Sequence, residues 1–212
     1  MEYNEDKLAF EGYFGPFLAS KLNDGQGLAG YNPLQLFQES VMKAFIAGVI
    51  VTLLVLAAGA YLSVINGWVP ANADDRPGSL ETWAAHKSLR ATIEREMPKG
   101  AVPLAVNDEN LLQGIQLYAK NCAVCHGNAS AQPSNIANGL FQHAPQLARH
   151  GVTDDPEGKI YWFIKHGVRL TGMPAFTDNL TEQQIWQVTL FLKHMDDLSA
   201  KAEKAWKAVP QP

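Results

Sequence analysis

The segment Asn121–Gly127, NCAVCHG, holds both cysteines of the chain, Cys122 and Cys125, and a histidine directly after the second. Thiols at this spacing occur in redox disulfides, in half of a zinc site and at the attachment point of a covalently bound haem. Two cysteines among 212 residues are too few for a disulfide framework. The spacing therefore indicates local chemistry at these two side chains.

Two of the three interpretations fit the surrounding sequence poorly. A structural zinc site needs four ligands, and the second pair would be His143 and His150, which are separated by six residues instead of the usual three to five. A thioredoxin-type redox pair needs a βαβ setting and an activated thiolate at a helix start. Here the motif follows a helical pattern, in a region where no segment indicates a strand.

A c-type haem site accounts for the whole motif. Two thiols three residues apart lie on one side of a helical turn, where they can add to the two vinyl groups of one porphyrin. His126 would then be held beneath the iron as an axial ligand. The predicted cofactor is one covalent haem c.

Met173 is the predicted second axial ligand. It lies between Gly172, which allows close backbone approach, and Pro174, which fixes the chain and has no N–H to satisfy. Met/His ligation raises the potential and closes the iron to outside ligands. The competing side chains are His86, His143, His150, His166 and His194, and His166 is the most serious rival because it precedes the same loop.

The elements that must position these residues are helices. Apolar residues recur at helical spacing in residues 108–122, 153–167 and 180–206, with start signals at Asp108, at Asp154 or Asp155, and at Thr181. The loop between the first two, residues 127–150, is long for a compact domain, and a large apolar cofactor would give it a surface to cover.

Residues Ala44–Ile65 carry no charge and are long enough to span a membrane as one helix. Tyr61 and Trp68 stand where interfacial aromatic residues belong. The alternative is a signal peptide cleaved near Ala71–Ala73, but signal h-regions run to only about 7–15 residues. We therefore predict an uncleaved anchor. Positive charges on the two sides nearly balance and do not orient it.

Three further features bear on partners. The net charge of −4 and the lack of a basic stripe exclude a nucleic-acid footprint. The aromatic N-terminal segment is either a tail near the membrane or a docking element for another membrane subunit. Between the anchor and the helical half, SLETWAAHKSLRATIEREMP predicts one helix that ends at Pro98. It is either a surface spacer or a strap packed on the following domain.

The C-terminal half resembles a bacterial, membrane-anchored, monohaem class I cytochrome c. The resemblance rests on four stretches in the family's order: GIQLYAKNCAVCHG (114–127), APQL (144–147), IYWFIKHGVRLTGMPAF (160–176) and LTEQQIWQVTLFLKHM (180–195). It implies thioether bonds at Cys122 and Cys125, His126 as the proximal ligand and Met173 as the distal one.

Further contacts are implied by the same resemblance. Gly114 would lie where the first helix crosses the last, beside Phe191. Pro145 would accept the N–H of the proximal histidine and so orient its ring. Trp162 and Arg169 are candidate contacts of the haem propionates, against plain roles as a core aromatic and a solvated charge.

The resemblance also implies an all-α chain in the bacterial inner membrane, with its N-terminus in the cytoplasm and its haem domain in the periplasm. The expected parts are a cytoplasmic segment (1–43), a transmembrane helix (44–66), a periplasmic linker with one helix (67–107), the haem domain (108–198) and a C-terminal tail (199–212).

The expected function is electron transfer without substrate chemistry, so the chain is not itself an enzyme. Redox proteins are the expected partners: a membrane oxidoreductase complex, a periplasmic dehydrogenase or a terminal oxidase. No small-molecule substrate is expected. From residue 108 onward the chain has nine basic and ten acidic residues. This near balance predicts weak long-range electrostatic steering of partners and favours a tethered or docked carrier. The alternative is a haem-based gas binder or sensor with an open sixth iron site.

Overall fold

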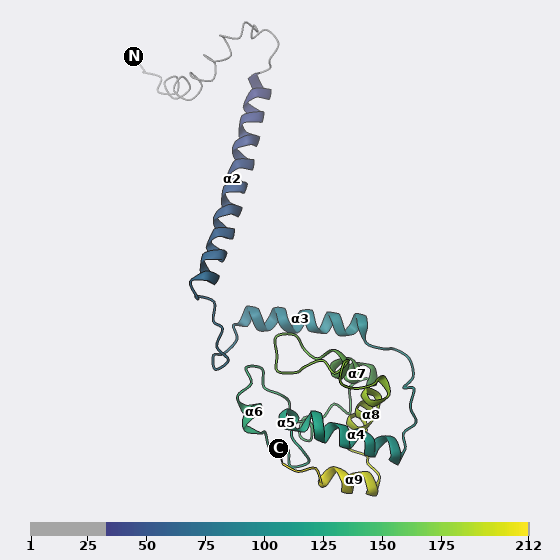
Figure 1. Ribbon diagram of the computed structural model, residues 1–212. Coiled ribbons are helices and arrows are strands. Elements are labelled where there is room, and N and C mark those ends of the chain that lie inside the picture. Colours follow the sequence, from purple (N-terminus) through teal and green to yellow (C-terminus); the bar gives the residue numbers. More distant parts are fainter. Residues whose placement is uncertain (1–32, 212) are drawn as a thin grey trace, which may run out of the picture. The chain divides into compact units, whose positions relative to one another are not determined.

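The computed structural model describes residues 33–211, with side chains from residue 37 onward. Within that part every regular element is a helix, which confirms the predicted all-α fold (Figure 1). The aromatic segment before residue 33, with its predicted docking role, lies outside the described residues. The chain divides into two units, Met1–Val69 and Pro70–Pro212.

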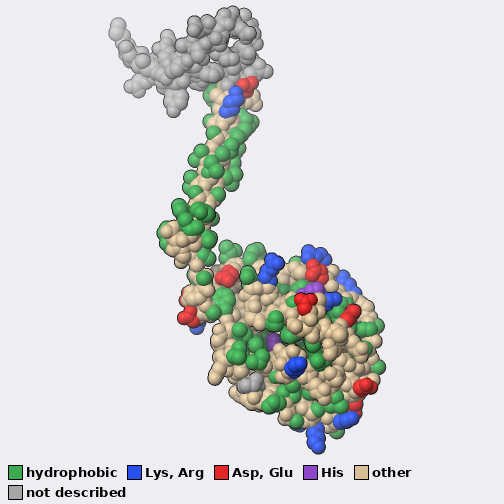
Figure 2. Space-filling view, in the orientation of Figure 1, with side chains coloured by type: hydrophobic (Ala, Val, Ile, Leu, Met, Phe, Trp, Pro, Cys, Tyr) green, Lys and Arg blue, Asp and Glu red, His purple; other side chains and the backbone are tan. Residues whose placement is uncertain are grey.

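The first unit contains α2 (Pro33–Ile65). Its stretch Phe37–Ile65 is long and apolar enough to cross a membrane, and none of its apolar window is buried. Hydrophobic side chains follow this helix along its length (Figure 2). The helix begins before the predicted start at Ala44, because no helix breaker intervenes and Pro33 is favoured in a first turn.

The second unit contains the remaining helices: α3 (Ser79–Glu96), α4 (Asp108–Asn121), α5 (Ala123–His126), α6 (Asn135–Asn138), α7 (Glu157–His166), α8 (Glu182–Lys193) and α9 (Ala200–Lys207). The predicted cap at Thr181 is confirmed, since its hydroxyl accepts the Gln184 N–H at 3.3 Å and the Gln184 side chain accepts the Thr181 N–H in return. The cap of α4 is Asn107, one residue before the predicted Asp108.

The core of this unit forms where α4 and α7 pack on α8. A Cβ at Gly114 would lie 2.2 Å from the Gln187 carbonyl oxygen and 2.9 Å from Cβ of Phe191, so the two helix backbones cross in direct contact at this glycine. On the other side of α8, the rings of Tyr161 and Trp186 stack with centroids 4.1 Å apart. These contacts fix α4 and α7 on α8.

Residues 199–212 are not the predicted tail. The expected third helix ends at Lys193, and Ser199 caps a separate helix, α9, by accepting the Ala202 N–H. Trp206 of α9 is buried against the rings of Tyr118 and Phe191, with centroids 5.4 and 5.1 Å away. The domain core therefore extends past the predicted boundary at residue 198 and includes α9.

The helix α3 is a strap packed on the domain, which decides between the two interpretations of the linker. Ile93 is buried, and Glu96 accepts a hydrogen bond from the indole N–H of Trp162 on α7 at 3.2 Å. A Cβ at Gly158 would lie only 1.9 Å from the Pro98 carbonyl oxygen, so the chain leaving α3 runs directly over the start of α7. Only residues 66–78 remain as a connector between α2 and α3.

Candidate functional site

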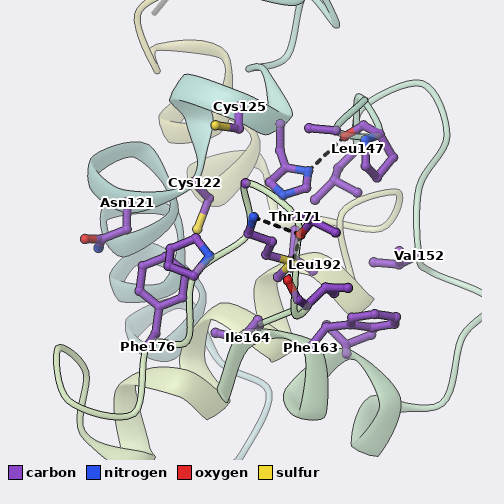
Figure 3. A pocket seen from close by; sticks show the side chains of 18 of the residues that line it. Asn121, Cys122, Cys125, Leu147, Val152, Phe163, Ile164, Thr171, Phe176 and Leu192 are labelled. Carbon is purple, nitrogen blue, oxygen red and sulfur yellow. Dashed lines mark hydrogen bonds between the residues drawn. The ribbon is translucent and has the colours of Figure 1, made fainter. Parts of the chain in front are cut away.

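A cavity of about 280 Å³ lies between the end of α4, α5, α7, α8 and two loops. Most of its lining is apolar, with Ile164, Phe176 and Leu192 on the sides (Figure 3). The lining brings together the four residues predicted to hold a haem, which come from segments about 50 positions apart: Cys122, Cys125, His126 and Met173.

The C-x-x-C-H motif forms a single turn of helix, α5, directly after α4. The His126 N–H bonds the Cys122 carbonyl at 2.9 Å, which closes the turn. Gly127 then adopts φ 74°, and a Cβ there would lie 2.4 Å from the Gln146 side-chain oxygen, so both backbone angle and space require glycine. Beneath the turn, the buried Tyr118 hydroxyl donates to the Gly127 carbonyl at 2.8 Å.

The ring of His126 is oriented by Pro145, whose carbonyl lies 2.9 Å from Nδ1. This is the contact that the resemblance implied. With Nδ1 as the donor, Nε2 keeps a free lone pair for a metal. Burial lowers the pKa of His126, opposed by the hydrogen bond to Pro145, so the neutral ring that a metal ligand requires is favoured.

The two cysteines are not joined in a disulfide, and Cys122 lacks the activated thiolate of a redox pair. Burial raises the pKa of Cys122 to about 12, and the adjacent Cys125 adds to the shift. A disulfide oxidoreductase needs the opposite shift, toward an activated thiolate. The zinc interpretation gains no support either, because residues 33–211 contain no group of three metal-ligating His, Cys, Asp or Glu side chains.

Met173 lies on a loop that the domain holds at both ends. Its backbone N–H donates to Oγ1 of Thr171 at 3.1 Å, and that hydroxyl donates in turn to the Val168 carbonyl at 2.8 Å (Figure 3). Gly167, with φ 62°, passes so close to the Met173–Pro174 backbone that a Cβ would lie 2.6 Å from the Met173 oxygen. The loop is therefore fixed in the structure.

Two candidate haem contacts do not line the cavity. Trp162 is buried on the side of α7 that faces α3, where its N–H is taken by Glu96, and Arg169 is exposed to solvent. Among the competing histidines, His166 is not in the lining and packs near the Trp162 ring at 5.2 Å. His143 does line the cavity and is the structural rival of Met173.

Sequence reasoning did not single out most of the apolar lining, which includes Leu140, Val152 and Phe163. Thr171, whose hydroxyl holds the Met173 loop, was also missed. The signal for it was its place two residues before the methionine in a loop, where a hydroxyl commonly bonds a nearby backbone N–H. A turn that presents two thiols and an oriented histidine to an apolar cavity is the arrangement of a covalent haem site.

The family model and a curated relative agree with this class. Residues 109–192 match the family model described as "Cytochrome C oxidase, cbb3-type, subunit III". A "Cytochrome c6-like" protein of Nostoc sp. is 30% identical over 101 residues, covering 48% of this chain and 79% of the relative. One chain of the reducing HAO-like protein complex of Kuenenia stuttgartiensis is 21% identical, with a TM-score of 0.37, over 45% of this chain and 48% of that one.

The chain belongs to the cytochrome c family. Family membership makes it an electron-transfer protein with haem c as its cofactor and redox proteins as its partners. The residues present fit that cofactor, since the cavity supplies thiols, a neutral imidazole, a thioether and an apolar lining. The helix α2 accounts for anchoring in a membrane.

Proposed function

We propose that this chain is a membrane-anchored cytochrome c that carries single electrons on one covalently attached haem, with His126 and Met173 as axial ligands. The observation that carries the proposal is the convergence of Cys122, Cys125, His126 and Met173 on one apolar cavity. When bound, the haem supplies an iron that takes up and releases one electron.

The residues around the cavity would do the rest by holding their positions. Cys122 and Cys125 would fix the group covalently, and the Pro145 carbonyl would keep the His126 ring in one tautomer and orientation. The bonded Thr171 loop would keep the Met173 sulfur available in both oxidation states. The apolar lining would exclude water and so limit the rearrangement that accompanies each electron transfer.

The location follows from the chemistry of attachment. In this family the haem is attached outside the cytoplasm, so the haem domain would lie on the outer side of the bacterial inner membrane and the N-terminus in the cytoplasm. The nearly balanced charge of the domain supports a carrier that is tethered to, or a permanent subunit of, a larger oxidoreductase.

Absorption spectra of the purified full-length protein in both redox states, with and without carbon monoxide, test the ligands. We expect a low-spin haem that does not bind carbon monoxide. Met173→Ala should open the iron to it, whereas His143→Ala, the matched change at the rival in the lining, should leave the spectrum unchanged.

Two results would count against the proposal. An unchanged spectrum in Met173→Ala would remove Met173 as a ligand, and a changed spectrum in His143→Ala would put His143 in its place. Rapid carbon monoxide binding by the unaltered protein would instead favour the sensor alternative.

A further inference from the structure

The strap α3 has two faces with different surroundings. Its inner face carries the buried Ile93 and is fixed to α7 by the hydrogen bond from Trp162 to Glu96. Leu80 and Trp83, three residues apart near its N-terminal end, do not pack on the domain and are 74% and 60% exposed. Residues at this spacing lie on the same side of a helix. Two large apolar side chains therefore form an uncovered surface at one end of the strap.

This end of α3 is tied closely to the membrane helix. The connector between Ile65 and Ser79 has thirteen residues, which fully extended reach about 45 Å. A flexible chain of that length spans on average about 20 Å. The connector also carries Trp68 and Val69, which lie shortly after the end of α2 and are 73% and 55% exposed. The chain therefore passes from the membrane helix to the uncovered surface within thirteen residues.

We infer that the N-terminal end of α3 rests on the bilayer that holds α2, with Leu80 and Trp83 inserted at the boundary between headgroups and acyl chains. Trp and Leu are the residues that helices lying in an interface bury at this depth. Exposed Lys87 follows Leu80 after two turns and can reach the phosphate level while its stem stays on the apolar side.

Charge identifies the kind of lipid surface. From Pro70 to Arg90 three acidic residues balance three basic ones: Asp74, Asp75 and Glu81 against Arg76, Lys87 and Arg90. Attraction to anionic lipid would need an excess of positive charge, which this segment lacks. The contact is therefore insertion of apolar side chains into a zwitterionic surface, and added salt should change it little.

The contact would orient the haem domain. Because α3 is fixed to α7, and Phe163 and Ile164 of α7 line the cavity, a strap seated on the bilayer holds the cavity at one angle to the membrane. A surface spacer helix would leave the domain free to tumble. The strap gives the carrier a defined presentation to partners in the same membrane.

The test uses the full-length haem-loaded protein in nanodiscs of phosphatidylcholine that carries a photoactivatable group at the upper acyl chain. After irradiation, lipid attached to the stretch from Leu80 to Lys87 is quantified by mass spectrometry and compared with lipid attached around Leu170. Leu170 is the matched reference, because it is 93% exposed and lies in the loop of Met173. We expect strong labelling of the first stretch and background labelling of the second.

The double variant Leu80→Asn, Trp83→Gln should reduce labelling of the strap about five-fold or more, and Leu170→Asn should leave it unchanged. Neither Leu80 nor Trp83 lines the haem cavity, so the haem spectrum of each sample reports whether the domain is folded. Equal labelling of the two stretches in the unaltered protein would overturn the inference, even if the double variant did not fold. Unchanged labelling in the double variant would overturn it too, as would cross-links from Trp83 to another protein instead of lipid in native membranes.

Discussion

Replacing Gly114 by alanine tests whether the crossing of α4 over α8 depends on direct backbone contact. The added methyl carbon would lie 2.2 Å from the Gln187 carbonyl oxygen and 2.9 Å from Cβ of Phe191. A carbon–oxygen contact needs about 3.3 Å, so the helices would have to separate by about 1 Å. Neither obstacle is the movable end of a flexible side chain.

The expected loss of stability follows from two opposing contributions. Overpacking costs about 1–3 kcal/mol, and a clash between two helix backbones belongs at the upper end. Alanine favours the helix over glycine by about 1 kcal/mol. The net free energy of unfolding should therefore fall by about 2 kcal/mol, with a melting temperature lower by about 6–10 °C.

The assay is guanidinium unfolding of the haem-loaded protein in detergent, monitored by haem absorption. This signal does not respond to unfolding of α2. The control is Gly100→Ala, because a Cβ at Gly100 would meet nothing within 4 Å. If Gly114→Ala unfolded at the same denaturant concentration as Gly100→Ala, the close crossing would not be what holds these helices.

Three further predictions concern single contacts. Gly158→Ala places a Cβ 1.9 Å from the Pro98 oxygen, so it should release α3 and speed proteolysis between residues 79 and 107. Gly139→Ala, whose Cβ would have no contact under 3.6 Å, should not. Equal cleavage of both variants would contradict the packing of α3 on the domain. Tyr118→Phe removes the buried hydroxyl that donates to the Gly127 carbonyl, and it should lower the free energy of unfolding in denaturant by about 1–2 kcal/mol. Tyr161→Phe, whose hydroxyl has only a 3.4 Å contact, should lower it less. The reverse order would refute a stabilising role of the Tyr118 hydroxyl. Thr171→Val should speed carbon monoxide binding by loosening the Met173 loop, and Thr171→Ser should restore the slow rate; a Val variant with unchanged binding would show that the hydroxyl does not hold the loop.

The features that could be predicted from sequence are local along the chain. The turn of Cys122–His126, the cap at Thr181 and the apolar membrane helix each depend on residues within a few positions of one another. The site was predictable for the same reason, because the chemistry of thiol spacing and of a loop methionine is local.

The features that could not be predicted depend on contacts between distant segments. In the sequence, Trp206 continues the helical pattern of residues 180–206. Only its packing on Tyr118, about 90 positions earlier, makes α9 part of the core. Trp162 was a candidate haem contact because the family resemblance implied it, and the sequence pattern did not show which group its indole N–H bonds. That partner, Glu96, lies in the linker, and the sequence pattern left the position of the linker open.

The docking of α3 has a consequence for how often the haem domain meets a partner. With the strap counted as part of the domain, the tether shrinks from about 40 residues to thirteen. A domain on such a tether stays within a half-sphere of roughly 45 Å radius, which corresponds to an effective concentration of about 10 mM toward a partner anchored beside it. At that concentration even a weakly complementary surface is occupied much of the time. Selection among partners would then depend on which proteins share the same patch of membrane.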